Sequence, residues 1–188
     1  MSKRDDILDT ALKLFNAYSY NSIGVDRIIS ESGVAKMTFY KYFPSKEKLI
    51  YECLVQRNLN LQASINIALA QCEQNDYLGQ IRAIFNWYAI WFQSEDFNGC
   101  MFQKAVEEVI KIYPSTLEPA TQYKAWLTEL IQNLLTQLDI RNSTHLATLI
   151  VSILDGMTIQ AHINKNSVQI DEYWKRVDHL INFEKVLA

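Results

Sequence analysis

The sequence predicts an all-α fold of about nine helices. Of the 188 residues 49% are hydrophobic, yet only 5 are glycine and 3 are proline. So few turn residues argue against a sandwich of many short strands. Apolar residues instead recur three and four positions apart over long stretches, as amphipathic helices require. We find no convincing strand pattern and no internal repeat.

The first 50 residues predict three short helices. An apolar stripe from Arg4 to Tyr18 marks the first, and Val25 with Ile28 marks the second. Gly33 then supplies the left-handed conformation that a helix C-terminus favours. The third helix stops before Pro44. Two short helices separated by a glycine turn are typical of a helix-turn-helix unit.

The third helix is expected to have one buried side and one exposed arc. Val34 and Phe39 can face inward together with Phe43. The helical register leaves an outer arc of Lys36, Met37, Thr38, Tyr40 and Lys41. Such an arc suits the major groove of DNA, where some side chains reach base edges while others hold phosphates.

Charge is distributed unevenly along the chain. The whole sequence has a net charge of −3, but residues 1–50 hold 8 Lys and Arg against 6 Asp and Glu, a net +2. The remaining residues carry a net −5. The basic share therefore coincides with the predicted DNA-binding unit, although phosphate contacts must come from placement rather than bulk charge.

One motif is far more specific than a generic helix-turn-helix. It reads Gly33-Val34-x-Lys36-x-Thr38-Phe39-Tyr40-x-Tyr42-Phe43-x-Ser45-Lys46-Glu47-x-Leu49. Residues 7–50 resemble the N-terminal domain of the TetR family of one-component bacterial transcriptional regulators. Ile23 and Tyr42 depart from the Thr and His common there. The resemblance implies a DNA-binding domain over 1–47 and a ligand-binding and dimerisation domain over 48–188. Expected DNA contacts are Gly24, Arg27, Lys36, Met37, Thr38, Tyr40, Lys41, Tyr42 and Lys46.

The rest of the chain predicts six longer helical segments. They cover residues 45–73, 77–94, 100–112, 119–138, 144–163 and 170–187. Polar or proline-containing breaks separate them, and this layout is similar to the second domain of the same family.

An aromatic surplus marks a candidate effector pocket. Aromatic residues at helical spacing usually form core, but this set exceeds what a small bundle needs. Expected ligand contacts are Phe85, Trp87, Tyr88, Trp91, Phe102, Gln103, Val106, Glu107, Tyr123 and Trp126. Rings with a neighbouring amide and carboxylate suit a lipophilic or aromatic ligand, neutral or cationic.

Segments 123–138 and 144–163 carry apolar residues on more than one face. Two such helices per subunit can pair about a two-fold axis as a four-helix bundle, so we expect a homodimer; burial within one subunit is the alternative. Expected interface residues are Leu127, Leu134, Leu146, Leu149, Ile150, Ile153, Gly156 and Met157.

Other features narrow the function. The N-terminus lacks the apolar core of a signal peptide, and we expect a cytoplasmic protein with no membrane association. Cys53, Cys72 and Cys100 are odd in number and widely spaced, which argues against a disulfide framework. The three histidines lie 17 residues apart, so no metal site or other cofactor is expected.

These observations favour a regulator over an enzyme, since no catalytic constellation is evident. We expect a repressor that leaves a palindromic operator when a small molecule binds the C-terminal domain. One alternative is a thiol-redox regulator that acts through Cys100, which follows Asn98-Gly99 at a helix start. A small helical enzyme or adaptor is a further alternative.

Overall fold

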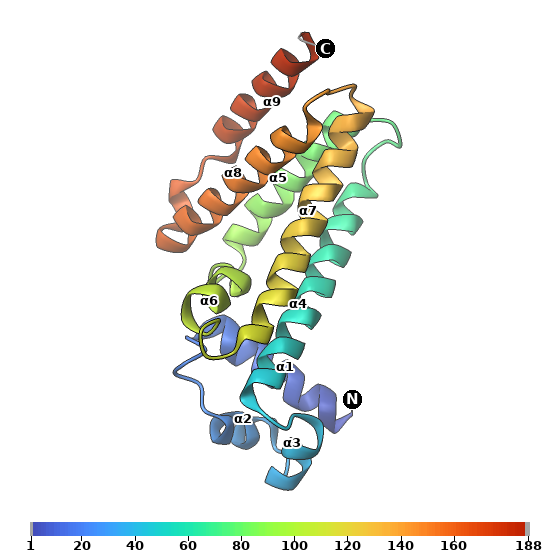
Figure 1. The fold of residues 1–188 in the computed structure, drawn as a ribbon. Helices are drawn as coiled ribbons and strands as arrows, with labels where there is room; N and C mark the ends of the chain where they lie inside the picture. The colour runs from blue at the N-terminus through green and yellow to red at the C-terminus, as the bar shows by residue number, and fades with distance from the viewer. Residues whose placement is uncertain (1, 187–188) are drawn as a thin grey trace. The chain divides into compact units, whose positions relative to one another are not determined.

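The computed structural model describes residues 2–186, which form nine α-helices and two 3-10 helices (Figure 1). The 3-10 helices are η1 (Pro114–Thr116) and η2 (Lys165–Ser167). The α-helices are α1 (Lys3–Ala17), α2 (Val25–Ser32), α3 (Lys36–Tyr42), α4 (Lys46–Leu69), α5 (Tyr77–Gln93), α6 (Met101–Glu108), α7 (Leu117–Gln137), α8 (Ser143–Ile163) and α9 (Ile170–Val186). No strand occurs among the described residues, and the predicted all-α class is confirmed.

Three predicted helix bounds differ from the structure by two residues or more. α4 ends at Leu69 rather than Glu73, because the N–H groups of Gln71 and Cys72 bond carbonyls three residues back, as in a turn. α6 ends at Glu108, earlier than predicted, because the backbone leaves helical geometry at Val109 (φ −126°, ψ −11°). α7 begins at Leu117, directly after the turn of η1, so Pro119 lies inside its first turn. A proline is tolerated there because the first N–H groups of a helix have no intrahelical partner.

The chain divides into two compact units. We call residues Met1–Leu61 and Asn98–Gln122 the head unit, and Gln62–Phe97 and Tyr123–Ala188 the bundle unit. Both α4 and α7 contribute residues to each unit. The boundary predicted at residue 47 was drawn between a DNA-binding and a ligand-binding function, not between compact units, and it stays a prediction.

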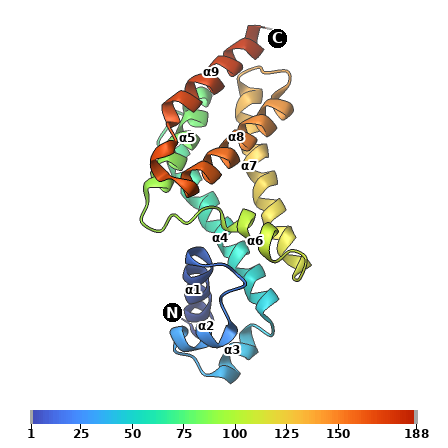
Figure 2. The ribbon, with the colours of Figure 1, turned by 90° about the vertical axis from the view of Figure 1, so that its left-hand side faces the viewer.

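In the head unit, α1, α2 and α3 gather beside the first half of α4 (Figures 1 and 2). Phe15, Ile28 and Phe39 are fully buried between them. Gly33 ends α2 with φ +65°, so it takes the left-handed conformation expected of it. A capping box between Ser2 and Asp5 begins α1. Local signals therefore mark the start of α1 and the end of α2.

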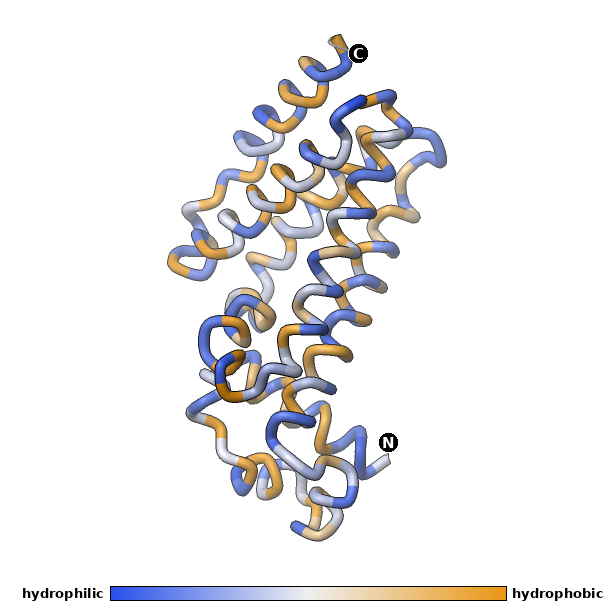
Figure 3. Tube along the Cα trace, viewed as in Figure 1, coloured by the Kyte–Doolittle hydropathy of each residue, from blue (hydrophilic) through white to orange (hydrophobic). Residues whose placement is uncertain are grey.

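In the bundle unit, α5 packs against both α8 and α9. Apolar and polar residues are interspersed along these helices (Figure 3), and apolar residues on one side of each helix are buried. α8 is the one described helix that is long and apolar enough to cross a membrane by length and composition. However, Ile150, Leu154 and Met157 are fully buried in the unit, as in the core helix of a folded domain.

Candidate nucleic-acid interface and its connections

α3 is anchored through one buried ring. Phe39 is fully buried and lies 6.1 Å from the ring of Phe43 and 5.3 Å from that of Tyr40, between centroids. With Phe39 inward, the remaining positions face outward: Met37 is 86% exposed and Tyr40 44% exposed. The inward orientation of Val34, Phe39 and Phe43 is confirmed, and the outer arc is accessible.

The charged side chains around α3 pair with exposed partners. Lys36 Nζ lies 3.3 Å from an Asp26 carboxylate oxygen. Arg27 bonds Glu31 at 2.7 Å, and its guanidinium lies over the Tyr18 ring. Exposed pairs of this kind contribute little to stability because water screens them. Phosphate oxygens can therefore replace these carboxylates at small cost.

The other expected DNA contacts also lie on the surface. Lys41 Nζ lies over the ring of Tyr42, which is 37% exposed, and Thr38 is half-buried. Gly24 is the N-cap of α2, and a Cβ added to it would meet no heavy atom within 4 Å. The backbone there is open to a phosphate.

Two positions of the head unit make contacts in its interior. The ammonium of Lys46 donates to the Tyr20 carbonyl at 2.6 Å, and partial burial lowers its pKa below the ordinary lysine value. Ile23, where the family resemblance leads one to expect a threonine, is fully buried. Its side chain fills the core rather than meeting a phosphate. The sequence predicted a DNA contact for Lys46 but not this hydrogen bond within the head unit.

Sequence reasoning missed the role of Lys104 on α6. Its ammonium donates to the carbonyls of Phe15, Asn16 and Tyr18, at 2.8, 2.9 and 3.1 Å. These carbonyls end α1, where the helix dipole places negative charge, so a cation is favourable there. Burial lowers the pKa of Lys104, while the carboxylate of Glu108 acts in the opposite direction.

Glu108 accepts hydrogen bonds from the connection that follows α1. Its Oε2 accepts from the Ser19 hydroxyl at 2.8 Å and from the Tyr20 N–H at 2.7 Å. The Tyr20 hydroxyl is buried and donates to the Met101 carbonyl at 3.1 Å. Burial raises the Tyr20 pKa well above its ordinary value, so the phenol stays protonated as this bond requires. Together, Lys104 and Glu108 hold the α1–α2 connection to α6; we call this pair the α6 clamp.

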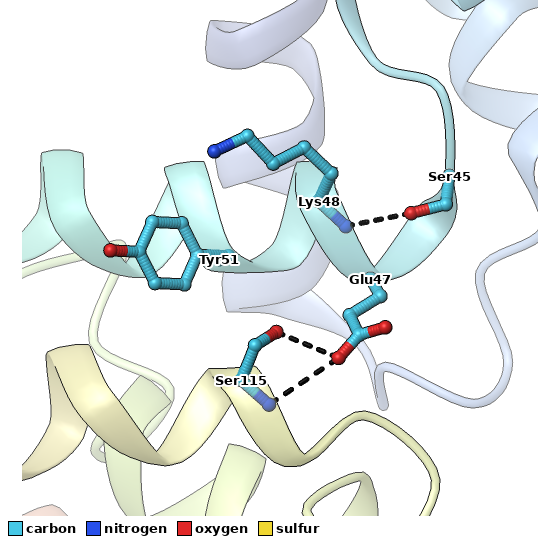
Figure 4. A pocket seen from close by; sticks show the side chains of 5 residues that line it. All are labelled: Ser45, Glu47, Lys48, Tyr51 and Ser115. Atoms are coloured by element: carbon cyan, nitrogen blue, oxygen red, sulfur yellow. Dashed lines mark hydrogen bonds between the residues drawn. The ribbon is translucent and has the colours of Figure 1, made fainter.

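A second connection joins the start of α4 to the segment before α7. The Glu47 carboxylate accepts from the Ser115 hydroxyl at 2.7 Å and from its N–H at 3.3 Å (Figure 4). Ser45 accepts from the Lys48 N–H at 3.1 Å, so it caps α4 as predicted. With Tyr51 these side chains line an open groove of about 290 Å³. Residues 98–122 therefore hold the DNA-binding helices at two places.

The bundle unit brings most of the expected aromatic residues together. Tyr88 and Tyr123, each 2% exposed, share a hydrogen bond between hydroxyls at 3.0 Å. The indole of Trp87 donates to Ser64 at 2.7 Å, and its ring lies 5.5 Å from that of Trp91. Trp126 stacks on Tyr123 at 6.3 Å. These five rings form an aromatic wall from α5 and α7.

The remaining expected ligand contacts fall elsewhere. Phe85 is fully buried and packs on Trp174 of α9, which the sequence did not single out. Phe102, Gln103, Val106 and Glu107 belong to α6 and thus to the head unit. Val106 is 39% exposed and Glu107 is exposed, so neither side chain is enclosed within the head unit, and their ligand contacts stay predictions.

The expected dimer residues divide by burial. Leu149 is 45% exposed, Gly156 is exposed and Ile153 is half-buried. The other five are buried, and their place in an interface stays a prediction: Leu127, Leu134, Leu146, Ile150 and Met157. On α9, Leu180 and Phe183 are exposed apolar side chains that sequence reasoning did not include.

The cysteines and acidic residues suggest no further chemistry. None of the three cysteines forms a disulfide. Cys53 is fully buried, which raises the pKa of its thiol well above the ordinary value, and Cys100 is the half-buried N-cap of α6. Among the described residues, no group of three or more His, Cys, Asp or Glu is placed to hold a metal ion.

Comparison with known proteins assigns the N-terminal helices. Residues 7–53 match the family described as bacterial regulatory proteins, tetR family. Over 48 residues the chain is 50% identical to the HTH-type transcriptional regulator YuxN of Bacillus subtilis (strain 168), a match that spans 26% of this chain and 16% of that protein. Over 168 residues it is 26% identical to the HTH-type transcriptional repressor ComR of Escherichia coli (strain K12), covering 84% and 79%.

Solved structures share the fold over nearly the whole chain. A TetR-family transcriptional regulator from Streptomyces coelicolor superposes with a TM-score of 0.80 at 23% identity, covering 97% of this chain and 94% of that one. The reduced form of Escherichia coli NemR gives 0.81 at 18% identity, covering 94% and 96%. Residues 7–53 therefore form a helix-turn-helix domain of the tetR family, and the chain as a whole has the fold of TetR-family transcriptional regulators.

Proposed function

We propose that the protein is a cytoplasmic repressor that binds a palindromic operator as a homodimer and releases it when a lipophilic or aromatic small molecule binds. The observation that carries this proposal is the exposed arc of α3 above the single buried ring of Phe39. Its lysines, hydroxyls and Met37 can meet DNA without unfolding the head. ComR, 26% identical over most of its length, is a repressor, which supports the proposed sign of regulation.

Dimerisation rests on the exposed apolar side of α8 and α9. Leu149 and Leu180 line an open groove of about 340 Å³, with Asn142, His145, Leu146 and Glu184 around them. Phe183 is 60% exposed on the same helix as Leu180. Two helices from each of two copies can bury such side chains as a four-helix bundle. The two α3 helices then need a separation of about 34–36 Å to read successive major grooves.

A charge placed at this surface tests the dimer. Leu149→Glu should bury an unpaired carboxylate at the seam and shift the protein to a monomer. Leu117→Glu, at a site of similar exposure in the head unit (42% against 45%), is the matched control and should leave the mass unchanged. Size-exclusion chromatography with light scattering measures both. A wild-type monomer at micromolar concentration contradicts the dimer and the two-half-site operator.

Effector binding is assigned to the aromatic wall. Trp87 and Trp91 are half-buried, so part of each indole remains accessible to a planar ligand. Aromatic faces also attract cations, which favours a lipophilic cation or a planar neutral molecule. Phe102 and Gln103 of α6 stay predicted contacts. The α6 clamp ties α6 to the α1–α2 connection, and this supports the proposal that a shift of α6 on ligand binding is passed on to the DNA-binding helices.

One experiment tests DNA binding and release together. A random library of double-stranded oligonucleotides is selected on the protein, and the recovered fragment is titrated by gel shift with and without candidate ligands. We expect a palindromic fragment, quenching of tryptophan fluorescence by planar or cationic lipophiles, and release of DNA over the same concentration range. Trp91→Ala should weaken quenching and release but leave ligand-free DNA binding intact. No selective fragment, or release only by small polar anions, contradicts the proposal.

The same assay separates the thiol-redox alternative. Cys100 begins α6 one turn before Lys104, so its oxidation would disturb the α6 clamp. If it is the sensor, a thiol oxidant releases DNA from the wild type and not from Cys100→Ser. We expect equal behaviour of the two proteins, because the proposed signal is a non-covalent ligand.

A further inference from the structure

Met37 has no structural role within the head unit. It is 86% exposed, more than any other large hydrophobic side chain among the described residues. The interior below α3 is already filled by Phe39, which is fully buried, and by Val34, which is 8% exposed. Isolated exposed apolar residues are ordinary on protein surfaces. The position of this one on α3 makes it informative.

Met37 is the second residue of α3, directly after Lys36. In a helix-turn-helix, the N-terminal residues of the second helix are those that contact base edges. The flanking lysine has an exposed ion pair and is able to donate to phosphates or to guanine. A thioether donates nothing and accepts only weakly. Its long, unbranched side chain is instead suited to an apolar contact.

Only one base edge in the major groove is apolar, namely the C5-methyl group of thymine. We propose that Met37 is a specificity-determining residue that reads a thymine methyl in each operator half-site. This inference rests on the proposed operator binding and adds a base identity to it. Substitution at Met37 changes base preference, whereas loss of a phosphate contact weakens binding to all sequences alike.

Replacing thymine by deoxyuridine tests the contact, because it removes the methyl group and keeps the base pair. Each thymine of the selected operator is replaced in turn, symmetrically in both half-sites, and affinity is measured by fluorescence anisotropy. Burial of one methyl-sized group contributes about fourfold in affinity, so the two half-sites together contribute about fifteenfold. We expect that loss for wild-type protein at one symmetric thymine position.

Met37→Gln, which keeps the length of the side chain, should bind the thymine and uracil forms of that position equally. Leu59→Gln, at an exposed apolar site of the head unit on α4, is the control and should keep the wild-type discrimination. If the protein selects a fragment but no uracil replacement weakens binding, or if Met37→Gln keeps the full effect, this inference alone is overturned. Failure to select any fragment overturns the proposed function with it.

Discussion

The head unit and the bundle unit both have an apolar core, but the contacts that distinguish them differ in kind. In the head unit, two charged side chains of the α6 clamp bond backbone groups of the α1–α2 connection. In the bundle unit, aromatic rings pack against one another along α5 and just after it, with the ring of Trp91 lying 4.9 Å from that of Phe97 and 5.8 Å from that of Phe92. Hydrogen bonds weaken steeply when donor and acceptor move out of line, whereas apolar contacts are non-directional and tolerate small shifts of the side chains. The head therefore suits a switch, and the bundle suits a scaffold.

The largest expected effect is in the bundle. Phe85→Ala removes a fully buried ring that packs on Trp174, and we expect about 3–5 kcal/mol less stability in urea unfolding followed by circular dichroism. Ile90→Ala lies on the same helix at a 74% exposed position and should change stability by less than about 0.5 kcal/mol. Equal effects from the two variants would show that α5 is not packed as described.

The second largest loss of stability is expected at the α6 clamp. Lys104→Met keeps the aliphatic stem but leaves three carbonyls of α1 and its C-terminal connection without their charged donor. We expect a loss of about 1.5–3 kcal/mol, with faster amide exchange around Tyr20. Lys111→Met, at an exposed lysine just after α6, is the matched control. Wild-type exchange rates in Lys104→Met would contradict the clamp.

Glu108→Gln is expected to be milder. The amide oxygen still accepts a hydrogen bond, but without charge, and we expect a loss of about 1 kcal/mol. Because Lys104 and Glu108 hold the same connection, the double variant Lys104→Met with Glu108→Gln should lose less than the sum of the single effects. Strict additivity in urea unfolding would mean that the two side chains act independently.

The smallest stability effect belongs to the DNA-binding face. Tyr40→Phe and Thr38→Ala remove hydroxyls from α3 and should leave the unfolding midpoint unchanged. Each should weaken operator binding by about three- to tenfold, the value of one hydrogen bond. Lys46→Ala provides the contrast, because its ammonium bonds the Tyr20 carbonyl and it should lose stability as well as affinity. Gel shifts measure the operator affinity of all three variants, and thermal unfolding measures their stability. Together they distinguish side chains that act at the surface from those that also act in the interior.

Local signals explain why the head could be predicted. Gly33 at a helix end, Phe39 between polar neighbours and Pro44 after the third helix each act within a few residues. The α6 clamp could not be predicted from such local signals, because Glu108 and Ser19, which share a hydrogen bond, lie 89 positions apart in the sequence. One signal was available: Lys104 and Glu108 share a helical face with the buried Met101 and Ala105. Charges on a buried face need partners.

The surface proposed for dimerisation shows a different limit to prediction from sequence. α8 is apolar on more than one side, so the sequence alone does not tell which side meets its own bundle. Burial separates Ile150, which is fully covered, from the adjacent Leu149, which is 45% exposed. Helical spacing places these neighbours about 100° apart, and the packing of α8 against α5 and its other neighbours selects the inner one.

The modest anchorage of α3 also bears on evolution. Phe39 alone of its seven residues is buried, and Lys36, Met37 and Lys41 are exposed positions with few folding constraints. After a gene duplication, one copy can accumulate changes at these positions and acquire a new target site while the molecule still folds. Regulators built this way can diversify their regulons through a handful of codons, with the remainder of the gene left as inherited.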